Sequence, residues 1–355
     1  MIVIDMHLDL AMNALNWNRD LKKSVAAIRA DETGMSEKGR AANTVAFPDM
    51  RAGDLAISSA TLLARENPRG TTRLDFRAPE MAYAFAMGCL AYYRLLEAEG
   101  VCRIITDWPG LERQVKDWET QGRDQTPLGF IISMEGADPI VSPDQVPHWY
   151  EAGLRVVSLV HYGVSRYAHG TGAPGGLTPL GKPMLHALRA AGMILDVTHL
   201  ADESFFQALE LYDGPILASH NNCRALVPGD RQFTDDQIKL IVARGGVIGA
   251  ACDNWMLYPG YVRLQTPSEL ISLKDVVDHI DHVCQLAGNA NHSAIGTDLD
   301  GGYGTEQSPG DLDTIADLQK IPDLLRGRGY AEADVQGIMY GNWLRLFQET
   351  WAPAG

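Results

Sequence analysis

The chain has 355 residues, 46% of them hydrophobic, and carries a formal net charge of −15. A large core is therefore available, whereas the acidic surface would repel nucleic acid and anionic lipid, so neither is expected as a partner. The five cysteines have no C-x-x-C spacing, which argues against a disulfide framework and against a cysteine zinc site.

Short apolar runs alternate with helix-length amphipathic segments along the chain. The predicted strands cover residues 3–6, 55–64, 129–134, 154–160, 193–197, 215–219, 246–252 and 293–297, and the predicted helices cover residues 80–100, 185–192, 203–211, 235–244 and 273–288. Several apolar runs are continuous, which is typical of strands buried on both faces. This alternation predicts an α/β fold, a (β/α)8 TIM barrel with long loops at the carboxyl ends of the strands; a doubly wound sheet would give a similar pattern.

Three connections are longer than the rest. Residues 17–53 are polar and are expected to form an extended loop over the active face, and residues 104–125 form an insertion with one amphipathic helix. Residues 161–182 are rich in glycine and proline but lack the Lys-Ser/Thr of a phosphate loop, so we expect a substrate loop or a plain connection.

No repeat, low-complexity tract or linker divides the chain, so we expect residues 1–355 to form one domain. The sequence shows no signal-peptide pattern and no apolar run long enough to span a bilayer, and a cytoplasmic protein is expected. An oligomer of identical chains is left open.

Side chains able to bind a metal or transfer a proton stand at the ends of six predicted strands. They are His7 with Asp9, Glu135, His161, His199, His220 and Asp298. In a barrel the carboxyl ends of the strands form one face, where the chemistry takes place. Any one of these residues could be a packed histidine or a solvated acid, but their repeated position favours a shared metal site.

The number of ligands favours two metal ions. His7, Asp9, His199 and His220 could bind metal directly, and Glu135 has two oxygens that could bridge two ions. Two cations about 3.5–4 Å apart can share one hydroxide and lower its pKa towards neutrality. With nitrogen and carboxylate ligands and no thiolate, Zn²⁺ is the first expectation, while Mn²⁺, Co²⁺ and Fe²⁺ stay open.

The other histidines are expected to play no part in the site. His279 and His282 resemble a helical metal pair, but they lie mid-helix, so a solvated helix face is expected. His148, His169, His186 and His292 lie in loops or helices, and His169 is the least easily dismissed because it lies in the glycine-rich loop. Trp255 is expected to be a packing residue or a pocket wall.

Taken in order and spacing, these motifs resemble the membrane (renal) dipeptidase family, binuclear zinc peptidases among the amidohydrolase-like barrels. The resemblance runs over residues 3–347. The matching stretches are residues 4–10, 133–136, 176–181, 195–199, 218–220, 278–282 with 287–288, 296–301 and 341–347.

The resemblance implies a role for each candidate residue. His7 and Asp9 would hold one zinc and His199 and His220 the other, with Glu135 as the bridge. His161 would polarise the substrate carbonyl and steady the oxyanion. Arg231, in the stretch Gly-Asp-Arg-Gln, would take the C-terminal carboxylate of the dipeptide, and Asp298 would shuttle the proton.

The sequence departs from the family pattern in two places near the substrate. Residues 165–169 replace a common Pro-Trp-Ala segment, and Trp255 stands where a tyrosine often lies. The dipeptide side chains are therefore left open. The expected function is a zinc dipeptidase that uses a metal-bridging hydroxide, and L,D-dipeptides are among its candidate substrates. The alternatives are an amidohydrolase for another small amide or lactam, and a metal-bound binding protein without hydrolytic activity.

Overall fold

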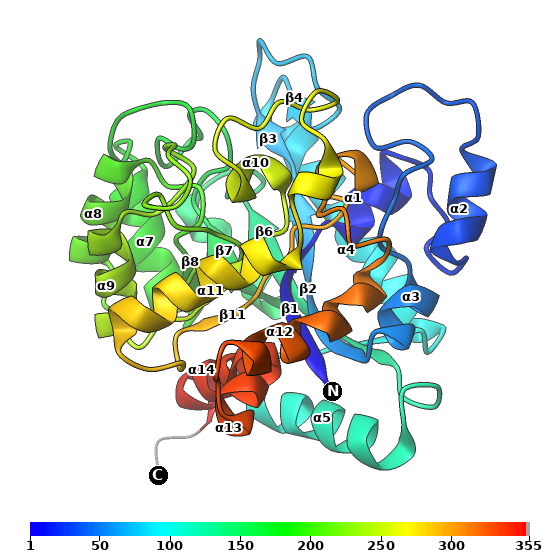
Figure 1. The fold of residues 1–355 in the computed structure, drawn as a ribbon. Coiled ribbons are helices and arrows are strands. Elements are labelled where there is room, and N and C mark those ends of the chain that lie inside the picture. The colour runs from blue at the N-terminus through cyan, green and yellow to red at the C-terminus, as the bar shows by residue number, and fades with distance from the viewer. Residues whose placement is uncertain (353–355) are drawn as a thin grey trace.

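The computed structural model of the protein describes residues 1–352 and confirms the predicted barrel, which Figure 1 shows from the side. Eight parallel strands follow one another around the barrel in chain order. They are β1 (Val3–Leu8), β2 (Leu55–Leu63), β6 (Leu128–Glu135), β7 (Leu154–Ser158), β8 (Ile194–Asp196), β9 (Ile216–Leu217), β10 (Ile248–Ala250) and β11 (Ser293–Ile295).

The ring closes between β9 and β10. Ala218, just after β9, forms a parallel bridge with Ile248. The Ala218 amide donates to the carbonyl of Val247 at 2.9 Å, and its own carbonyl accepts from the Gly249 amide at 2.8 Å. A closed ring distinguishes this fold from a doubly wound sheet, which has two open edges.

The strands are buried because their sequences are apolar on both sides. Every residue of β2, β6 and β7 is buried, as the continuous apolar runs predicted. The first strand is longer than expected: β1 extends to Leu8, so His7 lies within the strand rather than beyond its end. The backbone of His7 is held by the buried Asp5 carboxylate, which accepts from the His7 amide, and by the Asp298 amide, which donates to the His7 carbonyl at 3.3 Å.

Helices pack around the strands, and Figure 1 shows α7, α8 and α9 along one side of the barrel. The longer helices are α4 (Pro79–Ala98), α5 (Trp108–Gln121), α7 (Gly181–Ala190), α8 (Asp202–Leu211), α9 (Asp235–Ala243), α11 (Leu273–Ala287) and α14 (Asn342–Trp351). Local sequence sets their ends. Capping boxes begin α9 at Thr234 and α11 at Ser272, and Gly288 ends α11 in the left-handed conformation, with φ of 70°.

The C-terminal helices close the end of the barrel where the N-terminus lies (Figure 1). They are α12 (Ile321–Gly327), α13 (Glu332–Gln336), a π-helical turn η5 (Gly337–Gly341) and α14. The buried Trp343 indole donates to the carbonyl of Ile295 at 2.9 Å, and the Asn342 amide donates to the carbonyls of Ala290 and Ser293. This packing leaves the opposite end of the barrel for the cavity described below.

One of the long connecting segments differs from its prediction, and the insertion is confirmed. Residues 17–53 are not one extended loop, because they contain α2 (Val25–Asp31) and α3 (Phe47–Ala52). The predicted insertion at residues 104–125 contains α5, and the three residues of β5 (Cys102–Ile104) before it pair with the start of β6. The remaining short elements are α1 (Leu10–Leu15), β3 (Arg65–Glu66), β4 (Asp75–Phe76), η1 (Pro143–Gln145), α6 (Val146–Glu151), α10 (Asn254–Leu257), η2 (Ser268–Leu270), η3 (Thr305–Gln307) and η4 (Ile315–Lys320). None of the helices in residues 1–352 is both long and apolar enough to cross a membrane.

Asp138, in the loop after β6, holds two distant segments together. Its carboxylate accepts from the Glu66 amide of β3 and from the Arg166 amide, each at 2.9 Å. The Arg166 guanidinium also pairs with the Glu66 carboxylate at 2.8 Å. Burial raises the pKa of the Asp138 carboxyl to about 6, although the two backbone donors oppose the shift.

Replacement of Asp138 with asparagine should therefore remove a pH-dependent part of the stability. The folded state holds the Asp138 proton more tightly than the unfolded state, so this stabilisation is complete below about pH 4 and is lost as the pH rises through 6. The free energy of unfolding of the wild type, relative to D138N, should fall by about 2 kcal/mol between pH 4.5 and 7.5. The asparagine side chain has one oxygen and accepts only one of the two backbone hydrogen bonds. This loss lowers the free energy of unfolding of D138N by an amount that does not depend on pH. Denaturant unfolding of both proteins across this range checks the prediction, and a constant difference would contradict it.

Candidate metal centre

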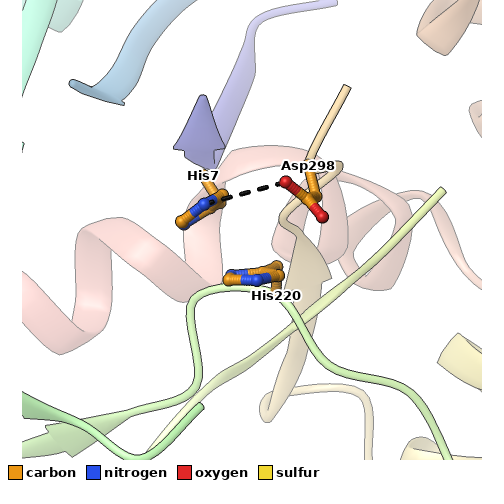
Figure 2. Close-up of side chains that lie close together, drawn as sticks. All are labelled: His7, His220 and Asp298. Carbon is orange, nitrogen blue, oxygen red and sulfur yellow. Dashed lines mark ion pairs between the residues drawn. The ribbon is translucent and has the colours of Figure 1, made fainter. Parts of the chain in front are cut away.

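The predicted ligands converge at the carboxyl ends of the strands. Figure 2 shows His7 from β1, His220 from the loop after β9 and Asp298 from the loop after β11 pointing toward one another. Three sets of side chains have ligand atoms within 4.8 Å of one another: His7 with His220 and Asp298; Glu135 with His199 and His220; and His7 with Asp9 and Glu135. The five side chains predicted to bind metal thus form one cluster, with Asp298 beside them.

Glu135 is the last residue of β6, and its two carboxylate oxygens lie near different histidines of this cluster. Its Oε1 lies 3.0 Å from Nε2 of His199 and 3.3 Å from Nε2 of His220. Its Oε2 lies 3.6 Å from Nε2 of His7. A carboxylate placed in this way can contribute one oxygen to each of two cations.

Several ligand atoms in the cluster lack the partners that buried polar atoms require. Nε2 of His7 and Oδ1 of Asp9 are buried without a hydrogen-bond partner in the described chain, and they lie 4.0 Å apart. Nε2 of His199 and Nε2 of His220 face each other at 3.2 Å. Bound cations would satisfy all four atoms. The residues therefore fit a metal site with nitrogen and oxygen donors.

The protonation states of His199, His220 and Glu135 also suit metal binding. Burial lowers the pKa of His199 and of His220 well below the usual value, so both imidazoles are neutral near pH 7. Burial alone would raise the pKa of Glu135, but the neighbouring histidines outweigh it and hold this pKa well below its usual range. Neutral imidazole and ionised carboxylate are the forms that bind metal.

The His7 side holds more negative charge. Burial lowers the pKa of His7, but the carboxylates of Glu135, Asp9 and Asp298 outweigh burial and raise it to about 10. Burial and the charge of Glu135 raise the pKa of Asp9 to about 7. A bound cation would replace the protons on His7 and Asp9, because its positive charge balances the negative charge of the neighbouring carboxylates in the same way.

Buried Asp5 fixes the end of β1 against the end of β11. Its Oδ1 accepts from the His7 amide at 3.1 Å and from the Thr297 amide at 2.9 Å. The next residue, Asp298, has φ of 58°, in the left-handed region that costs a residue other than glycine about 1 kcal/mol or more. The hydrogen bonds to Asp5 help to hold this strained backbone in place.

Asp196, the last residue of β8, holds the backbone in front of the other two histidines in the same way. Its Oδ1 accepts from the Thr198 amide at 3.0 Å and from the Ser219 amide at 3.1 Å, one residue before His199 and His220 respectively. His199 also has a left-handed backbone, with φ of 68°. Strained residues gather at functional sites, where the surrounding structure determines their conformation.

A cavity of about 280 Å³ opens next to the cluster, which is room for a small molecule. Of the predicted site residues it exposes Asp9, Glu135, His161, His199, Arg231 and Asp298. The cavity is also lined by further polar and aromatic residues, of which the sequence analysis singled out only Trp255. They are Lys38, Tyr162, Asp253, Trp255 and Gln307.

His161 forms part of the cavity wall beside Glu135. Its Nε2 lies 3.8 Å from Oε1 of Glu135, and its Nδ1 is buried without a partner in the described residues. Burial lowers the pKa of His161 to about 4, so the imidazole is neutral at pH 7. A neutral imidazole can donate one hydrogen bond to an oxygen in the cavity.

Arg231 is a buried cation, only 3% exposed, with neutral partners. Its guanidinium donates to the carbonyl of His220 at 2.8 Å and to Oδ1 of Asn221. Across residues 1–352 no carboxylate lies within ion-pair distance of it. A buried charge without a counter-ion is costly, and this guanidinium lines the cavity, so it is suited to an anionic ligand group.

The histidine pair on α11 is not the solvated face that was expected. His279 is buried, and its Nδ1 accepts from the Cys223 amide at 3.0 Å, because position 279 lies on the apolar face of α11. His282 pairs with Asp235 at 2.8 Å. His169 does not line the cavity, whereas Trp255 does.

Comparison with known proteins finds that the chain is similar to dipeptidases. The family model of the membrane dipeptidases (peptidase family M19) matches residues 1–353. The dipeptidase aclJ of Aspergillus oryzae is 30% identical over 228 residues, which are 62% of this chain and 51% of that protein, so the chain spans about half of the relative's length.

Two solved structures share the fold along the whole chain. The dipeptidase AC, a metallopeptidase of family M19, has a TM-score of 0.81 at 22% identity, with 99% of both chains covered. A metallopeptidase of Rhodobacter sphaeroides, crystallised with a phosphinate mimic of L-Ala-D-Ala, has a TM-score of 0.79 at 20% identity and the same coverage.

Proposed function

The chain belongs to the membrane dipeptidase family, peptidase family M19, and from this premise we propose that it is a binuclear zinc dipeptidase that hydrolyses free dipeptides. The observation that carries the proposal is the placement of Glu135, whose oxygens face His199 and His220 on one side and His7 on the other. His7 and Asp9 would hold one ion, His199 and His220 the second, and Glu135 both. Zinc held there would supply Lewis acidity and activate water near neutral pH.

Three other side chains would carry out the remaining steps. The neutral imidazole of His161 donates a hydrogen bond to the substrate carbonyl oxygen and stabilises the charge that develops on it. The guanidinium of Arg231 holds the C-terminal carboxylate of the dipeptide, which anchors the scissile bond. A carboxylate oxygen of Asp298 accepts the proton of the attacking water and returns it to the leaving amine. Burial raises the pKa of Asp298 well above its usual value, which favours holding this proton.

The proton-transfer role predicts a clear result for D298N. The amide cannot accept a proton, so kcat should fall by about 10²–10⁴-fold with little change in KM. Because Asp298 Oδ1 lies 3.8 Å from Nε2 of His7, Asp298 could instead be a ligand. Metal analysis separates the roles: we expect the variant to retain two ions, and the loss of one would show that Asp298 binds metal.

A panel of dipeptides tests the function. The zinc-loaded protein is given L,L- and L,D-dipeptides together with the same peptides amidated at the C-terminus. The L,D series is included because the Rhodobacter sphaeroides relative was crystallised with a mimic of such a peptide. We expect free dipeptides to be cleaved and their amides to be cleaved poorly, because an amide offers Arg231 no charge. Equal cleavage of both would favour an amidohydrolase for other small amides or lactams. No cleavage by protein that holds two zinc ions would favour a binding protein without hydrolytic activity.

A further inference from the structure

The hydroxyl of Ser219 lies between histidines from both halves of the metal cluster. Its Oγ is 2.9 Å from Nδ1 of His220 and 3.4 Å from Nδ1 of His7. Ser219 is 1% exposed, and the imidazole rings of His7 and His220 lie with their centroids 3.6 Å apart and their planes tilted by 35°. One buried side chain therefore contacts one predicted ligand of each ion.

The position of this hydroxyl is fixed from two sides. The Ser219 amide donates to Oδ1 of Asp196 at 3.1 Å, which holds the backbone at the end of the barrel. The hydroxyl itself lies 3.5 Å from Oγ1 of Thr198, which can accept its proton. The two lone pairs of Ser219 Oγ are then free for the two imidazoles.

This arrangement selects one tautomer for both rings. Once a cation replaces the Nε2 proton of His7, the Nδ1–H groups of His7 and His220 can both donate to Ser219, and each ring presents an unprotonated Nε2, the atom that faces Glu135. A partner on the second ring nitrogen is the usual way in which proteins orient a metal-binding histidine. Usually each histidine has its own partner, as His199 has in Thr171, whose Oγ1 lies 2.9 Å from Nδ1.

We infer that Ser219 is a positioning residue shared by the two ion sites and that it couples their loading. An ion at one site fixes the tautomer of its histidine and the orientation of the hydroxyl, and this prepares the other histidine for the second ion. The inference rests on the proposed binuclear site. Coupling between two sites is typically worth about 5–150-fold in affinity.

Zinc titration of the metal-free protein against a chromophoric chelator tests the inference without reference to activity. In S219A we expect both stepwise affinities to fall by about 10–100-fold and the coupling between them to disappear. T171V removes a hydroxyl that contacts only His199, so it should lower only one of the two stepwise zinc affinities. S59A removes a buried hydroxyl that bonds Ser133 and contacts no histidine, and it should leave both steps unchanged. Wild-type constants in S219A, or an effect on one step only, would overturn the inference.

Two further observations keep the test decisive. If the wild type binds fewer than two zinc ions, the binuclear proposal fails by itself, whatever S219A does. If S219A does not fold, nitrogen-15 NMR of the zinc-loaded wild type replaces it. We expect His7 and His220 both to carry their ring proton on Nδ1 with slow exchange, and a proton on Nε2 of either ring would overturn the inference.

Discussion

Replacing Glu135 with glutamine is expected to remove at least one of the two metal ions and to lower dipeptide hydrolysis by at least about 10³-fold. The reason is geometric. The carboxylate presents one oxygen to His199 and His220 and the other to His7. Glutamine keeps one oxygen but turns an NH₂ group, which cannot bind metal, toward the other half of the cluster. The measurement is the metal content after dialysis, together with kcat on a cleaved dipeptide.

Asp138 offers a matched control for this change. D138N makes the same chemical substitution three residues further on, at a buried carboxyl that contacts backbone amides instead of the cluster. We expect this variant to retain two ions. If E135Q also retained two ions after dialysis, Glu135 could not be the shared ligand, and the binuclear assignment would have to be abandoned.

Replacing Arg231 with methionine is expected to lower kcat/KM for free dipeptides by about 10²–10³-fold, mainly through KM. The substrate carboxylate would lose a buried guanidinium that has no other counter-ion in the described chain. Hydrolysis of C-terminally amidated dipeptides should change little, so the wild-type preference for free peptides should shrink. The kcat/KM of R231K for free dipeptides should lie between those of the wild type and R231M, because lysine keeps the charge but lacks the planar guanidinium group.

The variant needs two checks because Arg231 also donates to the carbonyl of His220. Metal content must equal that of the wild type, which shows that His220 has kept its place. Arg224 provides the matched control: its guanidinium pairs with Asp202 at 2.7 Å, and it does not line the cavity. R224M should leave kcat/KM unchanged. Equal losses for free and amidated dipeptides in R231M would refute the carboxylate role.

The barrel and the convergence of the candidate metal ligands were predictable because both depend on local pattern. Each apolar run is long enough to mark a strand, and parallel strands bring residues at their carboxyl ends to one face. Glu135, His199 and His220 could therefore be placed together without knowing which loops surround them. The short elements were harder: α2 buries only Val25 and Ile28, too few apolar residues to mark a helix, and β5 has only three residues.

The cavity wall could not be predicted in the same way. Lys38 and Asp253 come from loops 215 positions apart, and nothing in either loop indicates that they meet at one cavity. The burial of His279 was also missed, because its mid-helix position suggested a solvated helix face, whereas the apolar positions around it place it inside. Ser219 stands next to a predicted ligand in sequence, but its contact with His7 spans 212 positions and depends on closure of the barrel.

Zinc titration of chelator-stripped protein, with dipeptide hydrolysis measured at each step, tests the binuclear site most directly. The structure predicts no hydrolysis by the stripped protein and a rate that rises to a plateau at two equivalents of zinc per chain. Hydrolysis by the stripped protein, or a plateau at one equivalent, would contradict two ions that share Glu135.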